Sequence, residues 1–302
     1  MTSTDVLDPS APLLPGEPAA GGRSLRGAVR DFSRNRMGVI GVALLVLMLL
    51  FSFVGPLLYP TDQIHPNLLQ VTRPPSAQFP LGTDQVGYNV LGRLMVAGQS
   101  TLEVGLAAAV IATLVGTLWG AVAGFIGGWV DSALMRIVDA LLAIPALLLI
   151  LLLTTVVTPS VVMVIFVLGL ISWLITARLV RGQVLVIKSL DYVQAARQMG
   201  ERSWHIVTRH LVPNVIGLVV VQATFEVANA ILLFAALSFL GLGPPPPATN
   251  WGGMLNDGLN YVFDGYWWLI YPAGVCIVIT VVAFNMIGDA IRNSLEVRLS
   301  RR

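Results

Sequence analysis

Long apolar runs that lack charged residues alternate with shorter polar segments along this chain of 302 residues. A helix of about 20 residues crosses the hydrocarbon core of a bilayer, which is about 30 Å thick. The pattern therefore predicts an all-α integral membrane protein with six transmembrane helices. The first has its apolar centre at residues 39–58, and the others lie at about residues 101–127, 133–156, 160–178, 212–240 and 266–289.

The count of six depends on one charge-free run, residues 140–177, which is nearly twice as long as one crossing requires. Pro159 stands near the middle of this run, within a Thr-Pro-Ser sequence. Proline interrupts a helix because it has no amide hydrogen to donate. We therefore expect a hairpin of two spans that turns at Pro159.

The composition agrees with a membrane protein. Charged residues make up 11% of the chain and hydrophobic residues 56%, whereas soluble domains carry about 25% and about 45–50%. Too few polar side chains remain to cover a water-soluble globule, which excludes an ordinary cytosolic enzyme, and the apolar content excludes a disordered chain. The single cysteine excludes a disulfide framework and a zinc site built from cysteines.

The basic residues are distributed unevenly between the predicted loops. If the N-terminus is cytoplasmic, 16 of the 18 Lys and Arg residues lie on the cytoplasmic side, and only Arg73 and Arg93 lie outside. Cytoplasmic loops carry an excess of positive charge. We therefore expect both termini in the cytoplasm, with tails at residues 1–36 and 291–302, and an uncleaved first span that acts as an anchor.

The first part of the N-terminal tail is expected to be disordered. It carries Pro9, Pro12, Pro15 and Pro18 at a spacing of three, which is compatible with polyproline II. A flexible tail and a short recognition motif both fit this composition.

Two predicted outer segments are long, residues 59–98 and 241–265. The second is rich in aromatic residues, which suit the headgroup level of a membrane. An anchor that lies along the outer surface and a docking surface for an external partner are both open. The aromatic residues near this segment are Trp251, Tyr261, Phe263, Tyr266, Trp267 and Trp268.

Glycines recur at every fourth position in the second span, at Gly116, Gly120, Gly124 and Gly128. This spacing puts them on one face of a helix, where a second helix can approach closely. Static packing and an interface that slides during a transport cycle both remain open.

Glu226 is the acidic residue that lies deepest within a predicted span, with Asn229 one turn further on. A carboxylate at this depth costs about 2.5–3.5 kcal/mol unless it faces a wet cavity or the bundle interior. A place on the translocation pathway and a structural hydrogen bond are both open. Glu226 is also the candidate that a proton-coupled transporter would require.

Catalytic chemistry is not evident in the sequence, and we predict no catalytic or metal-binding residue. His65 is predicted on the opposite side of the membrane from His205 and His210, which we interpret as solvated loop residues. The single lysine, Lys188, follows Ile187, whereas the Walker A phosphate loop requires Gly-Lys before Ser or Thr. The chain therefore has no ATP site of this type.

The cytoplasmic loop between the fourth and fifth spans, residues 179–211, contains the most informative pattern. Asp191 can cap a short helix from Tyr192 onward, and Gly200 can end it in the left-handed conformation. Ala195 and Ala196 keep one face of this helix small. Pro213 then suits the first turn of the fifth span. The helix could insert into a groove on another protein, or simply lie at the membrane surface.

The spacing of Ala195, Ala196, Gly200 and Pro213 resembles the Glu-Ala-Ala loop of binding-protein-dependent ABC importer permeases. Gln194 stands where that pattern has Glu, and Val212 where it has Leu. Further segments resemble the second, C-type permease subunit of dipeptide, oligopeptide and nickel importers, although Gly87-Tyr88-Asn89 replaces the usual Gly-Arg-Asp. These segments are Phe32–Gly41, Leu81–Arg93, Arg136–Pro145, Leu237–Gly243, Asn250–Gly258 and Phe284–Leu295.

The resemblance implies a type I permease domain at residues 97–290, preceded by an extra N-terminal span and an extracytoplasmic segment within residues 37–96. It implies the cytoplasmic membrane of a prokaryote. It also implies four partner chains besides membrane lipids: a homologous B-type permease, two ATPase subunits that bind ATP and Mg, and an extracytoplasmic solute-binding protein. No nucleic acid and no cofactor of its own are expected. The substrate could be a dipeptide, an oligopeptide, a glutathione-like compound or a nickel chelate.

The resemblance also suggests roles for individual residues. Glu226 and Asn229 are candidates for the translocation pathway, and Trp251, Asn256 and Asp257 for docking of the binding protein. The candidates for coupling to the ATPase are Tyr192, Gln194, Ala195, Ala196, Met199, Gly200, Glu201, Arg202 and Pro213.

Overall fold

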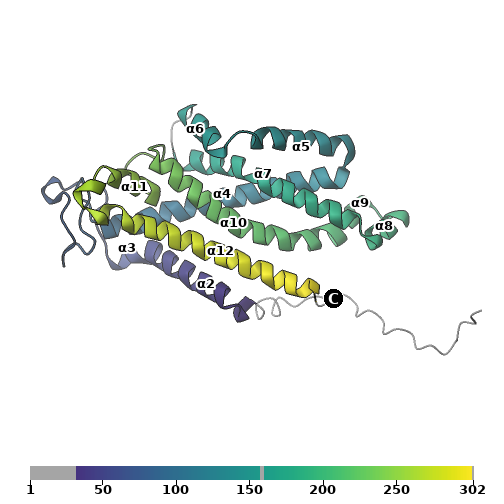
Figure 1. Cartoon of the computed structure of the whole chain (residues 1–302), viewed down its shortest axis with the longest axis horizontal. Helices are drawn as coiled ribbons and strands as arrows, with labels where there is room; N and C mark the ends of the chain where they lie inside the picture. The colour runs from purple at the N-terminus through teal and green to yellow at the C-terminus, as the bar shows by residue number, and fades with distance from the viewer. Residues whose placement is uncertain (1–31, 157–159, 301–302) are drawn as a thin grey trace, which may run out of the picture.

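The computed structural model describes residues 32–156 and 160–300, so most of the predicted N-terminal tail and the turn at Pro159 lie outside the described residues. Every regular element in the described part is helical, and the long helices run side by side in an elongated bundle (Figure 1). In chain order the elements are α2 (Arg36–Leu49), a π-helical turn (Leu50–Val54), α3 (Gly55–Leu58), a 3-10 turn (Leu68–Gln70), α4 (Val90–Ile126), α5 (Gly128–Leu142), α6 (Ala146–Val156), α7 (Val161–Lys188), α8 (Asp191–Gln198), α9 (Ser203–Ile206), a second π-helical turn (Val207–Leu211), α10 (Val212–Phe239), α11 (Trp251–Leu259), two 3-10 turns (Val262–Asp264 and Trp267–Leu269) and α12 (Tyr271–Ser300).

The described residues contain the membrane-spanning helices that the apolar runs predict. Five helices are long and apolar enough to cross a bilayer, and the bent pair α5 and α6 makes a sixth if it counts as one span. We call the two ends of the bundle the α11 end and the α8 end. The beginning of α2 and the end of α12 lie at the α8 end (Figure 1).

The first span, α2 with α3, packs along α12 (Figure 1). Asn35 starts it, because its side-chain oxygen accepts hydrogen bonds from the amides of Met37 (3.0 Å) and Gly38 (3.3 Å). A Cβ atom on Gly38 would lie 2.6 Å from the Cβ of Ala290 on α12. Small residues at this contact therefore let the two helices approach closely.

The contact between α4 and α7 is the most extensive in the bundle. An added Cβ on Gly116 would lie 2.6 Å from the carbonyl oxygen of Trp173, and one on Gly120 would lie 2.3 Å from that of Ala177. Real Cβ atoms do not approach backbone so closely, so these glycines form a tight seam. This geometry favours static packing over a sliding interface. Gly128 leaves the row, because the chain turns at Gly127 and starts α5.

Four helices extend beyond the ends that hydropathy predicts. A run of apolar residues measures only the part of a helix inside the bilayer, and α4, at about 1.5 Å per residue, is far longer than a bilayer is thick. The polar ends are stabilised by contacts within the protein, such as the bidentate pair of Arg181 with Asp131 (2.5 and 2.7 Å). The helices that differ are α4, which begins at Val90 rather than 101; α7, which ends at Lys188 rather than 178; the helix leading into α10, which begins at Ser203 rather than 212; and α12, which continues to Ser300 through the predicted C-terminal tail.

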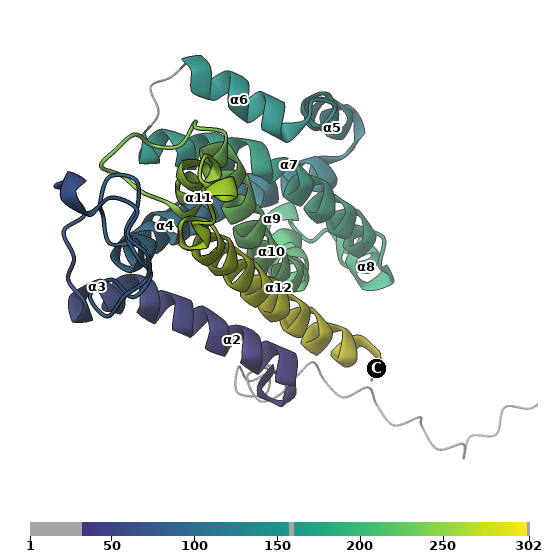
Figure 2. The same cartoon turned by 60° about the vertical axis from the view of Figure 1, so that its left-hand side comes forward.

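The span predicted at 133–156 is not one straight helix. It consists of α5 and α6, whose axes meet at 82°, and Figure 2 shows α6 running off across the bundle from the end of α5. Pro145 lies in the break. Proline disfavours helical backbone at the preceding residue and cannot donate to the carbonyl four residues before it, which explains the elbow.

Candidate functional site

The helix α8 lies in the connection between α7 and the long helix that leads into α10. It begins at Asp191, after Leu190 in an extended conformation, and no side chain caps it. The predicted cap by Asp191 is therefore wrong. Asp191 instead stands in the first turn, where its negative charge still suits the N-terminal end of the helix dipole.

The end of α8 is as predicted. Gly200 has a positive φ of 80°, and its amide donates to the carbonyl of Arg197 (3.1 Å). The amide of Glu201 donates to the carbonyl of Ala196 (3.1 Å). These two hydrogen bonds form a Schellman cap, which fixes where the helix stops and where the chain turns.

Two side chains hold the underside of α8. Val193 and Ala196 are buried, and Val193 packs with Ile206 and Leu211 of the following helix. Ala195 is exposed, so the two alanines that were expected to share one small face point in different directions. Ala196 therefore supports α8 from below and is not available for contact with a partner.

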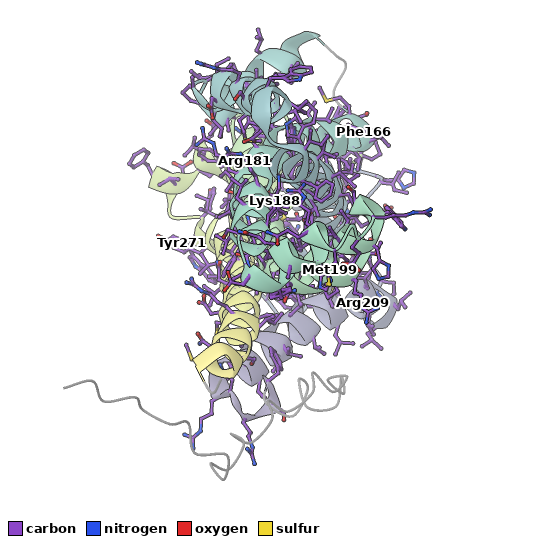
Figure 3. All side chains as sticks on the ribbon, turned by 90° about the vertical axis from the view of Figure 1, so that its right-hand side faces the viewer. Phe166, Arg181, Lys188, Met199, Arg209 and Tyr271 are labelled. Atoms are coloured by element: carbon purple, nitrogen blue, oxygen red, sulfur yellow. The ribbon has the colours of Figure 1, made fainter. Side chains whose placement is uncertain are left out.

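The other face of α8 and its surroundings are exposed. Gln194 and Arg202 are open to solvent, and the large side chains of Tyr192, Met199 (81% exposed) and Trp204 (76% exposed) also face outward. Seen from this end, Met199 and Arg209 lie at one margin of the molecule, with Lys188 nearer the middle (Figure 3). Such large apolar side chains in a loop region mark a surface that another protein can cover.

Glu201 joins α8 to the helix that follows. Its carboxylate lies 3.1 Å from Nε2 of His205 and 3.6 Å from Nε2 of His210, and the Tyr192 ring lies 5.6 Å from the His210 ring. We call Glu201 and these two histidines the Glu201 bracket. His205 is exposed, as predicted, whereas His210 is partly buried, and both contact Glu201, which the sequence does not predict. In the part of the chain that the structure describes, no group of three His, Cys, Asp or Glu residues could hold a metal ion.

Pro213 stands in the first turn of α10 (Val212–Phe239), as predicted for the fifth span, although the helical stretch itself starts earlier. It lies within one continuous helix, Ser203–Phe239, directly after the π-helical turn Val207–Leu211. A proline inside a helix leaves a carbonyl without its usual donor. The wider turn accommodates the ring, and the Asn214 side chain donates to the carbonyl of His210 (2.6 Å). The helix that follows α8 thus continues into α10 without a break.

Glu226 and Asn229 lie close together on α10, as predicted. Glu226 is 3% exposed and lies beside Ser172 of α7, Gln222 and Asn229. Its Oε1 atom accepts no hydrogen bond from the described residues. Asn229 is exposed on the surface of this single chain, at a depth where a polar side chain must face protein or water.

At the α11 end, the structure corrects the prediction for Trp251. This side chain is fully buried, and its indole nitrogen donates to the carbonyl of Leu94 (2.9 Å) while its amide donates to Thr101 Oγ1 (3.2 Å). It therefore anchors α11 to α4 and cannot contact a docked protein. Sequence alone does not separate a buried tryptophan from one at a surface.

The other aromatic residues of this segment also act mainly within the protein. Tyr266 packs against Tyr261 and Trp268, with ring centroids 6.0 and 5.2 Å apart. Trp268 donates to the carbonyl of Thr83 (3.3 Å). Phe263 differs, because it is completely exposed. The aromatic segment is thus chiefly a core that joins the two long segments of the α11 end.

Asn256 and Asp257 reach the surface of the α11 end. The Asn256 amide donates to the carbonyl of Phe239 (2.7 Å), and Asp257 lies 3.9 Å from Arg93. Arg93 also lies 3.5 Å from Asp84. Burial raises the pKa of Asp84 and of Asp257, and the nearby Arg93 charge opposes the shift.

Asp84 and Arg93 are not among the site residues that the sequence predicts. The available signal was that Arg93 is one of only two basic residues in the predicted outer segments. A cavity of about 380 Å³ lies beside Arg93, Asn256 and Asp257, between them and the loop 241–250.

Comparison with known proteins gives two matches to protein families. Residues 116–301 match the model of a binding-protein-dependent transport system inner membrane component. Residues 24–75 match the N-terminal transmembrane domain of oligopeptide transport permease C.

Individual relatives are similar over most of the chain. The dipeptide transport system permease protein DppC of Bacillus subtilis (strain 168) is 37% identical over 274 residues, 91% of this chain and 86% of the relative. The oligopeptide transport system permease protein OppC of Escherichia coli (strain K12) is 40% identical over 278 residues, 91% of this chain and 92% of the relative. The probable D,D-dipeptide transport system permease protein DdpC of the same strain is 38% identical over 261 residues, 85% and 86% of the two chains.

Proposed function

This chain belongs to the family of binding-protein-dependent transport system inner membrane components, and from this premise we propose that it is the C-type permease subunit of an ATP-driven importer of dipeptides or oligopeptides. It is a multi-pass inner membrane protein with a type I permease domain that follows an N-terminal span. The proposal for the substrate is supported by the relatives, which are named as dipeptide, oligopeptide and D,D-dipeptide permeases and match across most of the chain.

Both termini and α8 are assigned to the cytoplasm. The beginning of α2, the end of α12 and α8 lie at one end of the bundle (Figure 1). The connection at α8 is rich in Lys and Arg, whereas the α11 end carries Arg73 and Arg93. The positive-inside rule supports a cytoplasmic α8 end, which would put α8 on the side where ATP is available.

The α8 surface is the contact with a separate ATPase subunit. The observation that carries this proposal is the helix itself: α8 is fixed at its end by a Schellman cap, held below by Val193, and exposes Tyr192, Ala195 and Met199. A partner that moves when it binds ATP would displace α8. The Glu201 bracket and the continuous helix into α10 would then carry this movement toward Glu226. ATP and Mg would be bound by the ATPase subunits alone.

The translocation pathway would run along the face of α10 that carries Asn229. A polar side chain exposed at membrane depth requires a polar neighbour or water, and a homologous B-type permease on this face would supply both. Glu226 lies behind Asn229 and would polarise the path wall. Asn256, Asp257 and the cavity beside them would face the extracytoplasmic solute-binding protein.

The proposal can be tested by purifying the tagged full-length chain from its native membrane in mild detergent. We expect two ATPase subunits and a second permease to accompany it, and the membranes to take up labelled dipeptide or oligopeptide with ATP. A chain that transports peptide without any ATPase would refute the proposal.

A matched pair of variants tests the role of α8. Ala195→Glu adds a charge to the exposed face of α8, and Ala77→Glu adds the same charge at an exposed position of the α11 end. We expect Ala195→Glu to lose the ATPase subunits and ATP-driven uptake, whereas Ala77→Glu retains the ATPase subunits. Retention of both ATPases and uptake by Ala195→Glu would exclude α8 as the coupling surface.

A further inference from the structure

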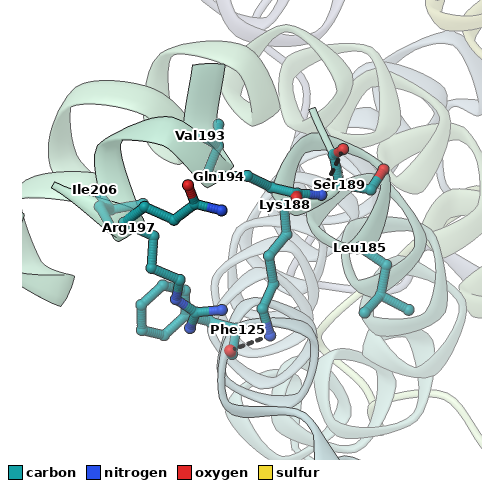
Figure 4. A pocket seen from close by; sticks show the side chains of 9 residues that line it. Phe125, Leu185, Lys188, Ser189, Val193, Gln194, Arg197 and Ile206 are labelled. Atoms are coloured by element: carbon teal, nitrogen blue, oxygen red, sulfur yellow. Dashed lines mark hydrogen bonds between the residues drawn. The ribbon is translucent and has the colours of Figure 1, made fainter. Parts of the chain in front are cut away.

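A cavity of about 490 Å³ lies between the ends of α4 and α7 and the helix α8 (Figure 4). It lies beside α8, next to the end of a membrane-spanning helix, and Gln194, Arg197 and Gln198 are exposed at its edge. Its lining residues are Phe125, Leu185, Lys188, Ser189, Val193, Gln194, Arg197, Gln198 and Ile206. We call it the α8 cavity.

Two cations face the α8 cavity. The Lys188 and Arg197 side chains extend toward Phe125 from α7 and from α8 (Figure 4). Lys188 Nζ donates to the carbonyls of Phe125 (2.6 Å) and Gly124 (3.2 Å), which neutralises none of its charge. Within the described residues, no group accepts a hydrogen bond from the Arg197 guanidinium.

None of the lining residues is acidic. Asp131 is an acidic side chain whose charge acts on Lys188. It already forms two hydrogen bonds with Arg181. Glu201 is likewise held by His205 and His210. The positive charge in the α8 cavity therefore lacks a dedicated counter-ion within the described part of this chain.

Gln194 contributes to this excess of positive charge because its side chain is neutral. Its side chain lines the cavity and donates to the carbonyl of Ser189 (3.1 Å). A glutamate at this position would bring a carboxylate into the same cavity and would offset one of the two cations. Glutamine leaves both charges in place and adds an amide that can donate a hydrogen bond.

We propose that the α8 cavity binds a phosphate group, held by Arg197 and Lys188 with the amides of Gln194 and Gln198 beside them. Arginine and lysine form strong charge-assisted hydrogen bonds to phosphate oxygens. An anionic lipid headgroup and a free phosphate share this chemistry. Bound there, either would tie α8 to the ends of α4 and α7. The assignment of the cavity to the cytoplasmic side depends on the proposed function, but the binding chemistry does not.

Two observations favour the lipid headgroup. Lys188 ends a helix of membrane-spanning length, which puts the cavity near the level of the headgroups. Phe125, Leu185 and Ile206 also supply an apolar wall beside the cations, which suits the glycerol and upper chain of a lipid better than a fully hydrated anion. Basic pockets between transmembrane helices bind such headgroups in the same way.

Native mass spectrometry of the full-length chain, purified with its partner subunits, tests the proposal. The protein is reconstituted in nanodiscs of phosphatidylcholine with phosphatidylglycerol, and the retained phosphatidylglycerol is counted. We expect Arg197→Gln to lower retention about tenfold, as the loss of a charge-assisted contact implies, and Gln194→Glu to lower it as well. Arg209→Gln removes an exposed cation of the same α8 end outside the cavity, and should retain the lipid.

A second arm uses nanodiscs of phosphatidylcholine alone and titrates inorganic phosphate by calorimetry. Binding that depends on Arg197 in this arm, without retention of phosphatidylglycerol, would identify free phosphate as the source. If Arg197→Gln and Arg209→Gln behave alike in both arms, the proposal is overturned. ATPase subunits are counted in the same samples, so a failure of the proposed coupling is seen independently of phosphate binding.

Discussion

At the α11 end, segments far apart in the sequence share one aromatic core, whereas at the α8 end a short helix is held by two buried side chains and the Glu201 bracket. Trp251 and Trp268 form hydrogen bonds that reach back to residues 94 and 83. The buried residues around α8 are aliphatic, such as Val193, Ile206 and Leu211, and the large side chains Met199 and Trp204 remain uncovered there.

The difference lies in how much of each end is held by contacts within this chain. At the α11 end, a buried aromatic core and the hydrogen bonds of Trp251 and Trp268 join distant segments within this one chain, although Phe263 is completely exposed there. The α8 end is defined in backbone geometry, yet it leaves an apolar surface and a charged cavity open. If α8 contacts an ATPase subunit, as proposed, an open surface lets the contact be made and released.

The largest difference should come from two tryptophans. Trp251→Ala removes a fully buried ring, and we expect a loss of about 3–5 kcal/mol in the free energy of unfolding. Trp204→Ala removes a ring that is mostly exposed at the α8 end, and stability should change by no more than about 0.5 kcal/mol. Thermal unfolding in detergent measures both, and equal losses would contradict the comparison.

The next largest difference should be in the stability that is lost when an ion pair is broken at each end. Arg93→Gln leaves Asp84 buried without its cation, and we expect a loss of about 2–3 kcal/mol at neutral pH, below the range for fully buried pairs because Asp257 is 41% exposed. Arg178→Gln breaks an exposed pair with Asp139 and should cost at most about 1 kcal/mol.

The pH dependence of the Arg93→Gln variant gives a further check. Burial raises the pKa of Asp84 and Asp257, so the folded state binds more protons than the unfolded state. Their contribution to stability therefore rises as pH falls through the folded-state pKa. We expect Arg93→Gln to recover part of its lost stability on acidification, as these carboxylates take up protons. A loss that does not depend on pH would exclude the unpaired carboxylate as its cause.

Replacing glycine by alanine should change the free energy of unfolding in opposite directions at the two ends. A Cβ on Gly252 of α11 would lie 2.3 Å from the carbonyl oxygen of Ala235, whereas nothing lies within 4 Å of one on Gly182. We expect Gly252→Ala to destabilise by about 1–2 kcal/mol through overpacking. Gly182→Ala should stabilise by about 0.5 kcal/mol, because alanine favours the helix. Unfolding midpoints of the two variants would show this, and a shared sign would contradict it.

The smallest effect should be local to the α8 end. Glu201→Gln weakens the Glu201 bracket, and we expect less than about 1 kcal/mol of global destabilisation because the contacts are partly exposed. Amide hydrogen exchange in α8 should nevertheless become faster. Asp264→Asn, a matched change at an exposed site of the α11 end, should leave that exchange unaltered. Unchanged exchange in both variants would exclude the bracket as a support for α8.

The membrane-spanning helices could be predicted from the sequence because the bilayer sets a minimum length for an apolar run. Their ends could not, since polar ends such as that at Arg181 are stabilised by partners distant in sequence. Pro145 lies at the elbow between α5 and α6, but the length of the apolar run and Pro159 predict a straight span there. Periodicity and charge gave no access to these long-range contacts.

The candidate site divides in the same way. The end of α8 followed from Gly200, because a left-handed residue is a local property of the backbone. The burial of Trp251, the inward direction of Ala196 and the Glu201 bracket all depend on tertiary packing, which one sequence does not reveal. Residue type therefore predicts features that depend on the local backbone, such as the end of α8. It does not predict contacts between segments that are distant in sequence.

The tight seam between α4 and α7 also limits how the sequence can change in evolution. At Gly116, Gly120 and Gly124 even a single added carbon would meet the facing helix. A substitution at any of them would require the two helices to separate along their whole contact. Distant members of the family should therefore keep small residues at this spacing of four after most other positions have diverged, which gives a landmark for aligning them.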